Sequence, residues 1–144
     1  MAQLVLVAIH VLFNLVWIGS ITAVGWLVHR ASKASTPEAG KAIGELALDL
    51  YRNVAVWGFL GSFIAAVALV GTNVQTYIHA HWLHGKVTVA LGVIALHHVI
   101  GARAKKVAAG SMQAGGPGVI LVLALLACAL LSVVFVVFKQ ALVP

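Results

Sequence analysis

The chain has 144 residues, of which 62% are hydrophobic and 8% are charged, and its mean hydropathy is +1.09. A water-soluble domain carries about 25% charged residues, so this composition excludes an ordinary soluble globular protein. A membrane-spanning helix needs about 20 apolar residues, so the chain has room for about four spans and short loops. We therefore expect an all-α, integral membrane four-helix bundle that forms one domain over residues 1–144.

The first half of the chain predicts two long helices. The first covers residues 3–30 and ends at His29 and Arg30. It lacks the basic start, short apolar core and cleavage site of a signal peptide, so we interpret it as a span. Ser35 to Glu38 then show a Ser-x-x-Glu capping box with Pro37 in the first turn. An amphipathic and then apolar pattern follows, which predicts a helix over residues 37–78.

The second half predicts two more helices, over residues 81–106 and 118–139. The third helix contains His84, Lys86, His97 and His98 within an otherwise apolar segment. A glycine-rich stretch with Pro117 indicates a turn before the fourth helix. That fourth helix is the most uniformly apolar of the four.

Basic residues are distributed unevenly, and their net excess is +6. Of the nine Lys and Arg, seven lie in or beside the loops after the first and third helices: Arg30, Lys33, Lys41, Arg52, Arg103, Lys105 and Lys106. By the positive-inside rule these loops face the cytoplasm and both termini lie on the non-cytoplasmic side. We expect a multi-pass protein of a bacterial cytoplasmic membrane, whose charge reflects topology and anionic lipid rather than nucleic acid.

Histidine is the informative residue, because seven occur in so apolar a chain. His10 lies about two turns into the first helix and His84 about one turn into the third, so both lie at similar depths near the non-cytoplasmic face. Neutral imidazole binds haem iron, which makes the two residues candidate ligands of a haem b iron. The equally open alternative is a hydrogen bond between helices, to Asn14 or Thr88, worth about 1 kcal/mol.

Three further histidines are candidates for a second haem. His98 shares a helical face with His84, roughly 21 Å farther along the axis, and His29 of the first helix lies at a matching depth. His97 instead shares its face with Lys86. These three imidazoles lie near the cytoplasmic surface, where hydration is the simpler expectation. The chain has no Cys-x-x-Cys-His motif, and its lone Cys128 provides no thiolate cluster.

Two cations and two loop histidines complete the candidate residues. Lys86 lies about five residues inside the third helix, so its charge must reach the surface or find an anion such as a haem propionate or an acidic substrate. Arg52 could bind a carboxylate or phosphate bidentately, or act as an ordinary anchor of the topology. His79 and His81, with His84 nearby, could bind a metal, although solvated loop histidines are the simpler interpretation.

A family resemblance follows from these motifs. The run Trp82-Leu83-His84-Gly85-Lys86, with His97-His98, Gly101, Lys105 and Ala109-Gly110, resembles the third helix of the HemJ-type protoporphyrinogen oxidases. His10, Trp17 and Gly19 are similar to that family and to the copper-resistance D (CopD) type membrane proteins. Leu50-Tyr51-Arg52, Pro117 and Lys139 match the family's second and fourth helices.

The resemblance implies a four-helix membrane protein that binds haem b, often as an oligomer. It places His10 and His84 at the haem or active site and makes Arg52 and Lys86 functionally important. Two stretches depart from the family pattern: Thr22 to Trp26, and Met112 to Gly116. These departures affect porphyrinogen oxidation more than haem binding.

Three functions are therefore considered. The first is a haem b redox protein that oxidises protoporphyrinogen IX to protoporphyrin IX or passes electrons to quinone, with His84, Lys86 and Arg52 as its catalytic residues. The second is copper handling by His10, His79, His81 and His84, although the chain has only two methionines to supply soft thioether ligands. The third is a non-catalytic subunit of a larger membrane complex.

Overall fold

The computed structural model describes residues 1–138. In chain order its elements are α1 (Ala2–Ala31), α2 (Pro37–Leu50), the π-helical η1 (Tyr51–Ala55), α3 (Val56–Gly71), α4 (Val74–Ile78), α5 (His81–Ala108), the 3₁₀-helical η2 (Met112–Gly115) and α6 (Gly118–Val137). Lys139 and the expected end of the fourth helix lie outside the described residues.

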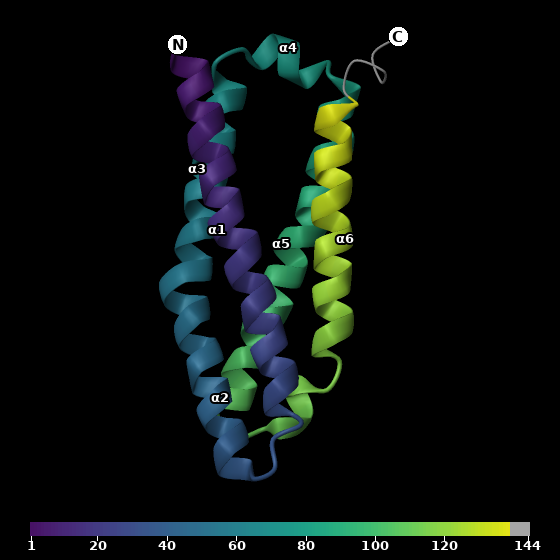
Figure 1. Cartoon of the computed structure of the whole chain (residues 1–144). Helices are drawn as coiled ribbons and strands as arrows, with labels where there is room; N and C mark the ends of the chain where they lie inside the picture. Colours follow the sequence, from purple (N-terminus) through teal and green to yellow (C-terminus); the bar gives the residue numbers. More distant parts are fainter. Residues whose placement is uncertain (139–144) are drawn as a thin grey trace.

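Four helical units are long and apolar enough to cross a membrane: Ala2–Ala31, Pro37–Gly71, His81–Ala108 and Met112–Val137. The second unit runs without interruption through α2, η1 and α3. The chain thus forms an all-α, four-helix, multi-pass membrane bundle, as its composition predicts. Both ends of the described chain lie at one end of this bundle, together with α4 (Figure 1).

Local side-chain hydrogen bonds set the limits of the second unit. The N-cap is Thr36, whose hydroxyl accepts a hydrogen bond from the Ala39 N–H at 3.2 Å, so the cap lies one residue later than the expected Ser35. The helix ends at Gly71 rather than at residue 78. Thr72 donates its hydroxyl to the Leu69 carbonyl at 2.7 Å, and Asn73 accepts from the Thr76 N–H at 3.2 Å. Such bonds compete with helix continuation, and α4 starts anew after them.

The bundle is tightly packed at one end only. All buried residues lie in the stretches 17–31, 40–65, 93–107 and 115–125, which we call the packed half. Within the described chain, no residue of 1–16, 66–92 or 126–138 is buried, and we call these stretches the open half. The basic loops belong to the packed half, whereas the chain ends and α4 belong to the open half.

Glycines allow the close helix approach in the packed half. A Cβ atom added at Gly58 of α3 would lie 2.8 Å from the backbone nitrogen of Trp17 in α1. One added at Gly44 of α2 would lie 2.7 Å from the backbone nitrogen of Ala108 in α5. Small residues of this kind let membrane helices pack backbone against backbone.

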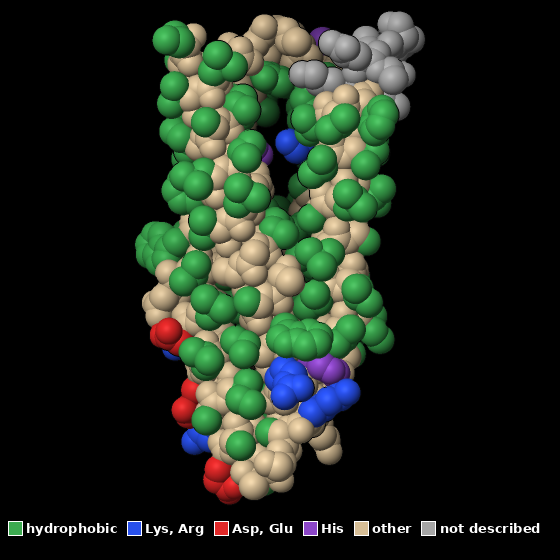
Figure 2. Space-filling model, viewed as in Figure 1, with side chains coloured by type: hydrophobic (Ala, Val, Ile, Leu, Met, Phe, Trp, Pro, Cys, Tyr) green, Lys and Arg blue, Asp and Glu red, His purple; other side chains and the backbone are tan. Residues whose placement is uncertain are grey.

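In the open half the helices separate into two pairs, α1 with α3 and α5 with α6, and α4 connects the pairs at the top (Figure 1). The space between the pairs is a hollow that reaches into the molecule (Figure 2). Among the polar residues of the spans, His10, Asn14, His84 and Lys86 belong to this open half.

Candidate functional site

His10 borders the hollow from α1, and its ring is held by two hydrogen bonds. Nδ1 lies 2.9 Å from the Ser62 carbonyl of α3, and Nε2 lies 2.9 Å from the side-chain nitrogen of Asn14. A carbonyl can only accept, so Nδ1 carries the proton and donates it to Ser62. Nε2 then uses its lone pair to accept from the Asn14 amide. The hydrogen bond between helices is therefore made to Ser62 of α3, which was not the expected partner, and the bond to Asn14 lies within α1.

Lys86 of α5 places a positive charge in the open half, where it is the one Lys or Arg among the described residues. The three acidic residues, Glu38, Glu45 and Asp49, all belong to α2 in the packed half. Within the described chain, Lys86 thus has no carboxylate partner, and its counter-ion must come from elsewhere.

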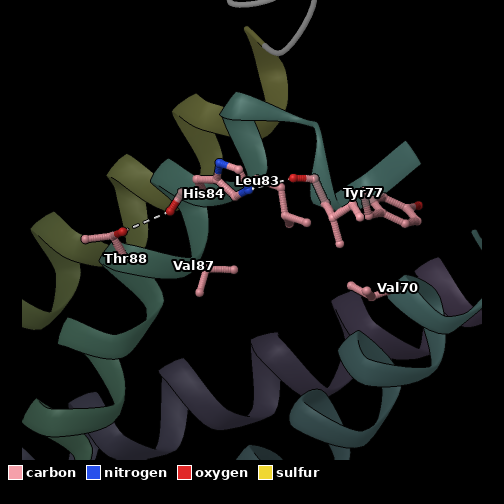
Figure 3. A pocket seen from close by; sticks show the side chains of 7 residues that line it. Val70, Tyr77, Leu83, His84, Val87 and Thr88 are labelled. Carbon is pink, nitrogen blue, oxygen red and sulfur yellow. Dashed lines mark hydrogen bonds between the residues drawn. The ribbon is translucent and has the colours of Figure 1, made fainter. Parts of the chain in front are cut away.

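His84 is exposed and lines an open pocket of about 360 Å³, formed by residues of α3, α4 and α5. The pocket is lined by Val70, Tyr77, Ile78, Leu83, His84, Val87 and Thr88, and the valine and leucine side chains point into the space between α3 and α5 (Figure 3). His84 Nε2 lies 3.0 Å from the Ile78 carbonyl, so Nε2 is the protonated nitrogen. Nδ1 therefore keeps its lone pair.

The structure gives His10 and His84 different partners. Among the described residues, no contact joins the two rings: His10 is held by α3, and His84 is held by the carbonyl that ends α4. Thr88, which was expected with Asn14 as a partner between helices, bonds instead within α5, to the His84 backbone carbonyl at 2.9 Å. Their roles as ligands of one iron stay predictions.

His97 lies deep in the packed half, where α1, the second unit and α5 cross. Its side chain is 1% exposed, so the expectation of a hydrated imidazole near the surface is wrong. Nδ1 accepts a hydrogen bond from the Trp17 indole N–H at 3.1 Å. The rings of Tyr51 and Phe59 lie against it, with centroids 5.0 and 5.3 Å away. Since an indole N–H can only donate, the single lone pair of a neutral His97 is already used.

The π-helical turn η1 places Tyr51 in this cluster. A π-helical turn contains one residue more than an α-helical turn and is often found at functional sites. The ring of Tyr51 occupies the space beside Gly101 that a side chain on α5 would fill. No local pattern indicates η1, and Trp17 and His97 are 80 residues apart, so neither the π turn nor this hydrogen bond could be predicted from neighbouring residues.

The remaining predicted site residues lie apart from the hollow. Arg52 is exposed on η1, at the level of Gly101, which is about 22 Å from Lys86 along α5 at 1.5 Å per residue. The expected group of His84, Lys86 and Arg52 is therefore not brought together. His98 is exposed and lies against Phe59, with ring centroids 6.1 Å apart. His29 lies beside Trp26 at the basic end.

Copper ligation has no preformed group in the described chain, where no three His, Cys, Asp or Glu side chains are arranged to hold a metal ion. His81 and His84 have ring centroids 6.1 Å apart, while His79 adds no third ligand to them. No protein-family model matches this sequence, and no curated protein or solved structure is significantly similar to it.

Proposed function

We propose that this membrane protein binds haem b in the hollow of its open half and acts as a redox protein. The observation that carries the proposal is the state of His84, a pocket-lining residue whose Nε2–H is held by the Ile78 carbonyl, so that Nδ1 keeps its lone pair. A carbonyl partner on one ring nitrogen is the usual way to orient a histidine that binds a metal through the other nitrogen.

Lys86 supports a ligand that carries carboxylates. An ammonium group among apolar helices is costly unless an anion is close, and the acids of this chain lie at the other end of the bundle. A haem propionate, or the propionate of a porphyrin substrate, has the required charge. Lys86 would hold that group and thereby orient the macrocycle in the hollow.

His84 and His10 differ in how readily each could bind the iron of haem b. His84 offers a free nitrogen, whereas the only lone pair of His10 is used by Asn14, so His10 serves as an iron ligand only after the Asn14 amide turns away. Haem b, when bound, supplies one-electron chemistry. The proposed reaction is oxidation of protoporphyrinogen IX to protoporphyrin IX, in which the electrons removed from the porphyrinogen are passed to a quinone or another acceptor and the protons are released. A second haem at His97 receives no support, because Trp17 already uses its lone pair.

Absorption spectroscopy tests the proposal. The protein is expressed with ample haem precursor, purified in detergent, and its Soret absorbance and haem per chain are measured for wild type, His84→Ala, His10→Ala and Lys86→Met. We expect His84→Ala to lose most of the Soret band and the other two variants to retain less haem. His79→Ala, a change in the loop before α5, is the matched control and keeps the band.

Two other results would replace the proposal. A colourless wild-type protein that contains copper would favour the CopD-like alternative. A protein that holds neither haem nor copper would favour a non-catalytic subunit of a larger complex, in which the histidines only join helices. Equal Soret bands in wild type and His84→Ala would remove His84 from the site.

We also propose that the packed half faces the cytoplasm of a bacterium, because it holds the basic loops. Single cysteines at Ser35 and at Thr76, in a Cys128→Ala background, test the orientation with a membrane-impermeant thiol reagent. The Thr76 position should react in cells whose inner membrane is intact, and the Ser35 position only after that membrane is opened. The reverse pattern would invert the topology.

A further inference from the structure

A second group of unusual side chains lies at the basic end of α1, far from the hollow. Trp26 is 53% exposed, and its ring centroid lies 5.9 Å from that of His29. Arg30 and Lys33 follow and are exposed. Figure 2 shows basic side chains and a histidine gathered at this end of the molecule, below a large hydrophobic side chain. We call Trp26, His29, Arg30 and Lys33 the α1 basic cluster.

The cluster has unmet polar groups. Nδ1 of His29 is buried and has no hydrogen-bond partner in the described chain. The ion pair formed by the described residues is Lys41 with Glu45, at 3.9 Å on α2, and Asp49 accepts a hydrogen bond from Asn53 at 2.6 Å. The carboxylates therefore belong to α2, and Arg30 and Lys33 keep their charges unpaired.

The cluster lies where α6 begins. A Cβ atom added at Gly118 would lie 2.9 Å from the Cβ of His29, so α1 and α6 are in contact here. Ile120 and Leu123 of α6 are 69% and 61% exposed and lie on faces of the helix turned away from this contact. An exposed tryptophan beside cations at the end of a span is the arrangement found at a membrane–water interface.

We propose that the α1 basic cluster binds the headgroup of an anionic glycerophospholipid. The phosphate would lie against Arg30 and Lys33, and an acyl chain would lie along the exposed Trp26 ring. Anionic lipid fits the charge of the cluster, and clusters of basic residues at the cytoplasmic end of a span attract such lipids. The site is independent of the proposed haem site and of any redox activity.

Thermal unfolding in a neutral detergent tests the proposal. Phosphatidylglycerol should raise the Tm of the wild type in a saturable way, and phosphatidylcholine with the same acyl chains should not. The double variant Arg30→Gln, Lys33→Gln should raise the half-saturating concentration of phosphatidylglycerol about tenfold or more. Lys41→Gln, which removes one charge at the same end from a residue already paired with Glu45, should leave it unchanged.

Two further measurements keep the test decisive. Glycerol phosphate, which has the phosphate but no acyl chains, should not change the Tm. A rise in Tm as large as that caused by the lipid would mean that the site binds a free anion instead. Native mass spectrometry of the wild type should retain phosphatidylglycerol in preference to phosphatidylcholine, and needs no variant. Equal retention of both lipids, or an equal loss in Lys41→Gln, would overturn the proposal.

Discussion

The partner of one ring nitrogen decides what the other nitrogen of each histidine can do. The lone pair of His10 accepts a hydrogen bond from Asn14, and the lone pair of His97 accepts one from Trp17. His84 donates its proton to a carbonyl and keeps its lone pair. Three histidines that look equivalent in the sequence therefore differ in their capacity to bind a metal.

The Trp17–His97 hydrogen bond should contribute measurably to stability. Trp17→Phe keeps an aromatic ring but leaves Nδ1 of the buried His97 without a donor, which should cost about 1–2 kcal/mol of unfolding free energy. Reversible unfolding in sodium dodecyl sulfate, followed by circular dichroism, measures the change. Trp57→Phe is the control, because Trp57 is 64% exposed, and it should stay within about 0.5 kcal/mol of wild type. Equal effects of the two changes would show that the hydrogen bond contributes nothing.

Lys86 should destabilise the protein when no ligand is present. Lys86→Met keeps the length and the apolar stem of the side chain but removes the charge from the hollow, so the ligand-free protein should gain about 1 kcal/mol or more. The same unfolding titration, done on haem-free protein, measures the gain. Lys106→Met removes an exposed charge at the basic end and should give no gain. A loss of stability in Lys86→Met would mean that the ammonium has a favourable partner.

At the level of helices, backbone contact at glycine sets the crossing of α1 and α3. Gly58→Ala places a methyl group 2.8 Å from the Trp17 nitrogen, so the helices must move apart and the protein should lose about 2 kcal/mol or more. Gly19→Ala is the matched control on α1, because nothing lies within 4 Å of its added Cβ. That change should be neutral or stabilise by up to about 1 kcal/mol. The Tm values of the two variants measure the contrast, and similar Tm values would contradict the close approach.

The sequence predicted the elements well because their signals are local. Apolar runs located the four spans, and Ser35 with Pro37 marked a helix start within one residue of the observed cap, Thr36. The early end of α3 was missed, because Val74 and Ile78 continue the apolar pattern beyond Thr72. Only the side-chain hydrogen bonds of Thr72 and Asn73 show that the helix stops.

The candidate site was only partly predictable. Helix geometry alone predicted that His10 and His84 lie at similar depths near one face of the membrane. The partners of each ring depend on how α3, α4 and α5 pack, and packing at contacts 52 or 80 residues apart leaves no local pattern. For the same reason the burial of His97 and the use of its lone pair could not be foreseen.

For the molecule as a whole, the uneven packing divides the bundle into a rigid part and a part that can adapt. The packed half joins all four spans through backbone contacts, whereas the open half joins them only in pairs and through α4. Residues with few buried contacts open at low free energy. A hollow between two helix pairs that are hinged at their far end can widen to admit a flat ligand from the bilayer and narrow around it.

Distances between spin labels on α1 and α6 should reveal this hinge. In a Cys128→Ala background, labels at Val5 and Val133 report on the open half, and labels at Ala23 and Leu123 report on the packed half; all four sites are exposed. Double electron–electron resonance should give a broad distribution of label-to-label distances for Val5 and Val133, and a narrow one for Ala23 and Leu123. Haem should narrow the first distribution and leave the second unchanged, because a ligand held by His84 and Lys86 would fix α5, and with it α6, relative to α1. Two equally narrow distributions in the ligand-free protein would mean that the helix pairs are fixed apart, and the hollow would then be a permanent cavity rather than a closing one.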